Sequence, residues 1–147
     1  MNKNKKGFTL VELLVVIVLI GLLVVIAVPS GLTISKKIKR NMMDKKIELI
    51  ESGAIVWGQN NNGKVKNPSL ACTKNTTGIT ACVRKDIGDM LNEENALEED
   101  YMEGTTKHLK NPITDKSLNE CYVEIYIKNK RVYASYDKTT NPSVCYY

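Results

Sequence analysis

The sequence predicts an α+β protein in which a long N-terminal helix packs on a small antiparallel β-sheet head. Three observations predict this class. An uninterrupted apolar stretch lies near the N-terminus, a helical repeat of apolar residues follows it, and an alternation of period two occupies residues 121–136. At 147 residues, the chain is long enough for one small domain with its own core.

The apolar stretch Leu10–Val28 is long enough to span a bilayer. As a helix it measures about 28 Å at 1.5 Å per residue, close to the ~30 Å of a hydrocarbon core. Lysines precede it, and a single acid, Glu12, stands inside it. A cleavable secretory signal, cut near residues 27–31, is the alternative. We disfavour it because the stretch exceeds the usual apolar region of such signals, contains Glu12 and leads into further helix.

The predicted helix continues beyond the apolar stretch as an amphipathic half. Apolar residues recur there at spacings of three to five and mark one stripe: Ile34, Ile38, Met42, Ile47, Ile50, Ala54 and Trp57. The polar run from Gln59 to Gly63 predicts the helix end. Pro29 interrupts the joined helix and removes one backbone donor, so we expect a kink there.

A short motif stands at the start of the apolar stretch, in which basic residues are followed by a glycine, an aromatic residue and then an acidic residue. It reads Lys5-Lys6-Gly7-Phe8-Thr9-Leu10-Val11-Glu12. This order closely resembles the cleavage and methylation motif of type IV prepilins. The resemblance implies that a membrane aspartyl peptidase cuts after Gly7 and methylates the new amine of Phe8. It covers about the first 30 residues, and beyond them only the layout of the chain is similar.

The resemblance also gives Glu12 a role. A carboxylate inside an apolar span is costly, so such acids are rare without a partner. The resemblance implies that the partner of Glu12 is the amine of Phe8 on an adjacent subunit. This pairing would set the axial register of a filament. A glutamate that merely reaches the membrane interface is the alternative. Gly21 and Pro29 lie where many type IV pilins have helix-weakening residues, so we expect a helix break there.

On this interpretation the chain has four parts. They are a leader peptide, residues 1–7, a transmembrane and filament-core helix segment, 8–29, an amphipathic helix half, 30–60, and an α+β head, 61–147. The implied location is a single pass in the cytoplasmic membrane before assembly, and then an extracellular pilus filament at the cell surface. The implied partners are copies of itself or other pilins, the prepilin peptidase and methylase, an inner-membrane assembly platform, and membrane lipid before assembly.

The head is predicted from a loop, a helical region and a hairpin. Residues 64–80 contain turn residues and no periodic pattern. Apolar residues at helical spacing then predict one or two short helices: Val83, Ile87, Met90, Leu91, Leu97 and Tyr101. After Pro112 the period changes to two, and two strands joined at Asn129-Lys130 predict a hairpin. A hairpin alone is marginal, so we expect it to pack on the helix, with a third strand that the pattern does not place.

All four cysteines lie in the head: Cys72, Cys82, Cys121 and Cys145. Their even number, without metal-ligand spacing, favours disulfides in an oxidising compartment over a zinc site. Three pairings are possible, and the spacing does not choose among them. A late disulfide is typical of pilins, and the pair Cys121–Cys145 is similar to it.

The sequence predicts a structural protein and not an enzyme. It has no phosphate-binding glycine loop, no zinc-protease motif and a single histidine. We expect no cofactor and no metal. The net charge of +5 falls to a small excess without the leader lysines, which argues against a specific nucleic-acid partner. The leading function is a pilin of a type IV pilus, with a role in cell adhesion. The alternative is a pseudopilin of a type II secretion or DNA-uptake system.

Two charge blocks lie outside the leader. The basic block is Lys36, Lys37, Lys39, Arg40, Lys45 and Lys46, and the acidic run is Asp86, Asp89, Glu93, Glu94, Glu98, Glu99, Asp100 and Glu103. We interpret each as a solvated face, with contact between the two blocks of neighbouring subunits as the alternative hypothesis.

Overall fold

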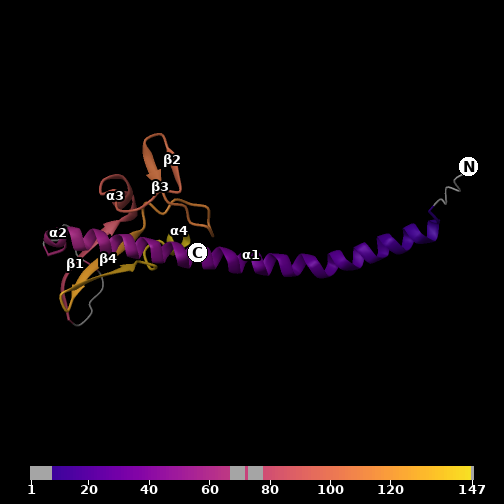
Figure 1. The fold of residues 1–147 in the computed structure, drawn as a ribbon, viewed down its shortest axis with the longest axis horizontal. Helices are drawn as coiled ribbons and strands as arrows, with labels where there is room; N and C mark the ends of the chain where they lie inside the picture. The colour runs from indigo at the N-terminus through magenta and orange to yellow at the C-terminus, as the bar shows by residue number, and fades with distance from the viewer. Residues whose placement is uncertain (1–7, 67–71, 73–77, 147) are drawn as a thin grey trace, which may run out of the picture. The chain divides into compact units, whose positions relative to one another are not determined.

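The computed structural model describes residues 8–66, 72 and 78–146, with the backbone alone for residues 26–32. Its elements are α1 (Leu10–Asn60), α2 (Asn62–Lys66), β1 (Ile79–Asp86), α3 (Ile87–Asn92), β2 (Tyr101–Glu103), β3 (Thr106–His108), β4 (Tyr122–Lys128), β5 (Arg131–Tyr136) and α4 (Pro142–Cys145) (Figure 1). The α+β class, with a long N-terminal helix and small antiparallel sheets, is confirmed.

The chain divides into two compact units, residues 1–38 and 39–147. The second half of α1 therefore belongs to the head. Its buried stripe explains this, because Met43, Ile47, Ile50, Ala54 and Trp57 are each at most 5% exposed and belong to the core of the head. These residues follow one another at spacings of four and three, which keeps them on one helix face.

The predicted stripe is wrong in its first part. Met42 is 55% exposed and its neighbour Met43 is buried, while Ile34 and Ile38 are also more than half exposed. One residue is a rotation of about 100° on a helix, so Met42 lies outside the face that continues into Ile47. The exposed residues form a second apolar face, which the sequence pattern merged with the buried one.

Three antiparallel strands form the main sheet, in the order β1-β4-β5. Val123, Ile125 and Ile127 of the central strand β4 are buried, as their alternation predicts. The predicted hairpin is confirmed, with Lys128 paired to Arg131 across a two-residue turn. Asn129 and Lys130 both have positive φ, 51° and 64°, which is the turn geometry that matches the twist of a hairpin.

The third strand of this sheet is β1, in a region where the sequence predicts loop and helix. Within the region predicted to be helical, residues 83–86 belong to strand β1, and only α3 is a helix. Val83 pairs with Ile125 and is buried, so hydrogen bonding to β4 overrides the local helical spacing. The helix begins where Asp86 caps it, since its carboxylate accepts from the Asp89 N–H at 2.7 Å.

Gly58 lets α1 lie directly against the sheet. A Cβ at this position would stand 2.7 Å from Ile125 Cγ2 and 2.8 Å from Val132 Cγ1. Both distances are below any normal carbon contact, so the helix and the strands approach closely only because the residue has no side chain.

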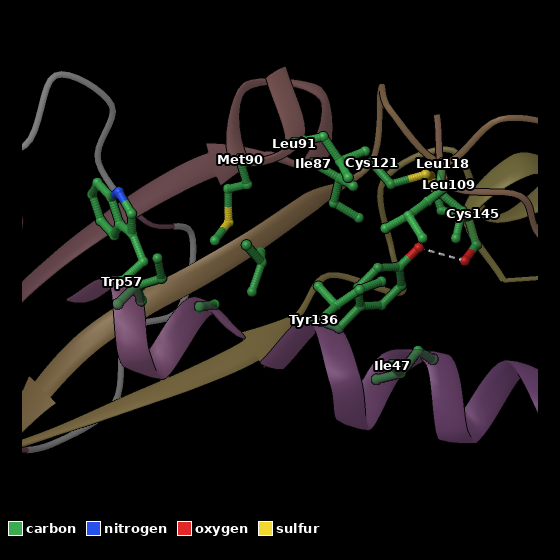
Figure 2. Close-up of a cluster of buried hydrophobic side chains, with 14 of the residues drawn as sticks. Ile47, Trp57, Ile87, Met90, Leu91, Leu109, Leu118, Cys121, Tyr136 and Cys145 are labelled. Carbon is green, nitrogen blue, oxygen red and sulfur yellow. Dashed lines mark hydrogen bonds between the residues drawn. A yellow bond between two sulfur atoms is a disulfide. The ribbon is translucent and has the colours of Figure 1, made fainter. Parts of the chain in front are cut away.

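The C-terminal segment is held to the core by a disulfide and by hydrogen bonds. Cys121 is bonded to Cys145, with both residues fully buried, and the Tyr136 hydroxyl donates to the Cys145 carbonyl at 2.7 Å (Figure 2). The buried side-chain amide of Asn111 donates to the Val144 carbonyl, also at 2.7 Å. The other disulfide joins Cys72 to Cys82, so all four cysteines are paired.

Candidate assembly site

The first turn of α1 is closed by a reciprocal pair of hydrogen-bonding residues. The Thr9 N–H and hydroxyl both donate to Glu12 Oε2, at 2.9 and 2.8 Å, and the Glu12 N–H donates back to the Thr9 hydroxyl at 3.3 Å. This is a capping box, in which a threonine before the helix and a glutamate three residues later satisfy backbone donors at the helix start. The pattern Thr-x-x-Glu in the sequence could have revealed it.

The capping box leaves part of the Glu12 carboxylate open. Both hydrogen bonds from Thr9 go to Oε2, and within the described residues no hydrogen bond reaches Oε1. The side chain is exposed at the helix start. A cation on a second chain can therefore pair with Oε1 while Thr9 fixes the orientation of the carboxylate.

The helix that follows exposes an unbroken apolar surface. Every large apolar side chain from Leu10 to Val25 is at least 42% exposed, and Leu10 and Val25 reach 80% and 74%. Exposed apolar surface costs about 25 cal/mol per Å², so a segment of this length needs lipid or other chains around it. Among the described residues, no helix is both long and apolar enough to cross a bilayer.

The predicted processing residues are Gly7 and Phe8, and the predicted helix-break residues are Gly21 and Pro29. Gly7 lies outside the described residues, and Phe8 is 78% exposed. The backbone of α1 is one helix through both Gly21 and Pro29. A Cβ on Gly21 would meet nothing within 4 Å, so no contact in this structure requires a glycine there. The helix break expected at Gly21 and Pro29 is thus not present in this structure, and we predict that the stretch between them loosens when the subunit leaves the bilayer.

Much of the acidic run is paired inside the head. Lys46 pairs with Asp100, and the Nζ atoms of Lys64 and Lys85 lie 3.1 and 3.2 Å from Glu94. The indole N–H of Trp57 and the two lysines together lower the pKa of Glu94 to about 2, while burial of the carboxylate opposes the shift. The indole makes no hydrogen bond of good geometry, so we ascribe the low pKa chiefly to the two ammonium groups. The run as a whole is therefore not a free acidic face.

The structure thus has a capped carboxylate at the start of an exposed apolar helix, and a small disulfide-bonded α+β head later in the chain. Residues 2–28 match the family model of the prokaryotic N-terminal methylation motif. The chain therefore carries this motif, and the resemblance predicted from residues 5–12 is confirmed.

One curated relative is named the ComG operon protein 3 homolog, from Bacillus licheniformis. It is 30% identical to this chain over 64 residues, which are 44% of this chain and 66% of the relative. The match thus spans just under two thirds of that protein. No solved structure matches the chain.

Proposed function

We propose that this protein is a structural, non-catalytic subunit of an extracellular filament of the type IV pilus class. The observation that carries the proposal is the Glu12 carboxylate, held by Thr9 at the start of an exposed apolar helix inside the matched methylation motif. An ordinary membrane anchor needs neither the acid nor the junction before it.

The proposed sequence of events follows the chain. A prepilin peptidase cuts after Gly7, and the new amine of Phe8 is methylated, which keeps its charge. The apolar half of α1 lies in the cytoplasmic membrane until the subunit is assembled. During assembly the Phe8 amine of one subunit pairs with Glu12 of another, so both charges are neutralised within an apolar surrounding.

A second candidate is a pseudopilin of a type II secretion or DNA-uptake system, which shares the same N-terminal chemistry. The similarity to a ComG operon protein 3 homolog is the observation that favours this candidate. Electron microscopy of material sheared from the cell surface separates the two. Long surface filaments that contain this chain support a pilus subunit, and their absence despite processing supports a pseudopilin.

Processing is tested on the mature protein. We expect intact-mass measurement and terminal sequencing to give an N-methylated Phe8. Replacing Gly7 with a bulky residue should leave the precursor uncut. A mature protein that begins near Ser30 would mean an ordinary signal peptide and would overturn the proposal.

The role of Glu12 is tested by Glu12→Val. Membrane insertion should be intact or improved because an apolar side chain replaces a charge. Assembly should be lost because the Phe8 amine has no partner. Filaments at the wild-type yield from this variant would contradict the pairing.

A further inference from the structure

We propose that a groove beside the second half of α1 binds residues 34–39 of a second copy of this chain. The inference rests on the proposed function, and it names a subunit contact outside the N-terminal motif. The groove has a volume of about 480 Å³ and lies between α1 and residues 96–100 of the head.

The floor of the groove is apolar and open. Leu49 and Val56 line it, seven residues apart on one face of α1, and they are 70% and 56% exposed. Leu97 lines the opposite side and packs on Gly53, where a Cβ would stand 2.5 Å from its Cδ2. The groove therefore presents aliphatic side chains that no described residue of the same chain covers.

The rim of the groove is acidic. Glu98 and Glu99 line it and are exposed. Among the described residues Glu98 has no ion pair, and Glu99 has only Lys107, at 4.0 Å. Asp100 differs from them, because Lys46 pairs with it and also donates to the Lys110 carbonyl at 2.8 Å. Glu98, and Glu99 with its one long ion pair, can thus meet a basic partner.

Residues 34–39 of α1 have the complementary chemistry. Ile34 and Ile38 share one helix face and are 58% and 52% exposed. Lys37 and Lys39 lie about 100° to either side of Ile38, so they flank that face. Within the described part of the chain neither lysine has an ion pair. The two isoleucines can pack on the apolar floor of the groove while the flanking lysines meet the acidic rim. Complementary charge of this kind fixes the register of a contact.

The contact is tested by charge reversal in the full-length protein, expressed in its host. Glu98→Lys should cause loss of surface filaments while cleavage after Gly7 is unchanged. Lys37→Glu added to this variant should restore filaments, which a folding defect would not allow. Glu120→Lys makes the same charge change at an exposed site away from the groove and should have no effect.

Zero-length carbodiimide cross-linking provides a second measurement. In filaments assembled from a mixture of isotopically light and heavy chains, we expect mixed-label peptides that join Lys37 or Lys39 to Glu98 or Glu99. Filaments from Glu98→Lys at the wild-type yield, or cross-links that map the basic segment to another surface, would overturn the groove contact alone. Failure of the wild-type chain to be processed or assembled would overturn the proposed function, and this contact with it.

Discussion

At the residue scale, the hydrogen bonding at the start of α1 depends on the Thr9 hydroxyl as much as on the Glu12 carboxylate. Thr9 donates twice to Glu12 and receives one hydrogen bond in return. The carboxylate is therefore oriented before any second chain arrives. A side chain that is already oriented loses less conformational entropy when a subunit contact forms. Thr9 thus acts as a positioning residue for Glu12.

Thr9→Ala should loosen the first turn of α1. Loss of a threonine cap costs a helix about 1 kcal/mol. We expect faster amide hydrogen exchange over residues 10–13 in the mature, detergent-solubilised protein, together with a reduced filament yield. Thr9→Ser keeps the hydroxyl and serves as the control. Equal exchange rates in the alanine and serine variants would show that the capping box has no role.

Glu94 should make the stability of the head depend on pH in the acidic range. Its pKa is lowered to about 2 from its ordinary value of 4.5. A carboxylate with a lowered folded-state pKa stabilises the fold above the unfolded value, and this contribution is lost as the pH falls through the folded value. The stability should therefore decline as the pH falls from about 4.5 towards 2, the range over which Glu94 takes up its proton.

Glu94→Gln should remove this contribution. We expect a lower free energy of unfolding at neutral pH and a flatter decline between pH 4.5 and 2, measured by denaturant titrations of the detergent-solubilised protein. Glu120→Gln, at an exposed acid, should leave the profile as in the wild type. A Glu94→Gln profile that is parallel to the wild type would contradict the assignment.

At the element scale, the packing of α1 on the main sheet is set by Gly58. Gly58→Ala should be destabilising because the new methyl group meets Ile125 and Val132. Overpacking of this kind costs about 1–3 kcal/mol. Gly63→Ala is the matched control, since nothing lies within 4 Å of its Cβ and alanine favours helix. We expect a lower melting temperature for the first variant only. Equal melting temperatures would mean that the helix and sheet shift apart freely.

At the scale of the whole molecule, the two disulfides differ in accessibility. Cys121 and Cys145 are fully buried, whereas Cys72 and Cys82 are half-buried. A reductant has to reach the sulfur atoms, so access controls the rate of exchange.

Stepwise reduction should therefore open the two bridges in a fixed order. The denatured, non-reduced mature protein should contain no free thiol. Under mild reductant in the native state, we expect Cys72 and Cys82 to be alkylated first, as followed by peptide mass spectrometry. Alkylation of Cys121 and Cys145 at the same rate would mean that the C-terminal segment opens readily.

Local patterns in the sequence determined much of this protein. The order of residues 5–12 predicts the N-terminal motif, because the motif is a contiguous string whose chemistry needs no tertiary contact. The apolar stretch predicts the first half of α1, and the alternation around Asn129-Lys130 predicts the hairpin, since turn geometry and pleat are local properties. The candidate site at Glu12 was therefore visible in the sequence.

Only the tertiary structure decided the features that depend on distant partners. Residues 83–86 form a strand because β4 offers hydrogen bonds, which no local spacing records. The exposed Met42 and the buried Met43 are distinguished only by which face of α1 meets the core of the head. The pairing of Cys121 with Cys145 and the groove beside Leu49 likewise arise where segments far apart in the chain come together. Such contacts are set by the packing of whole elements, so the sequence determines them only through the fold.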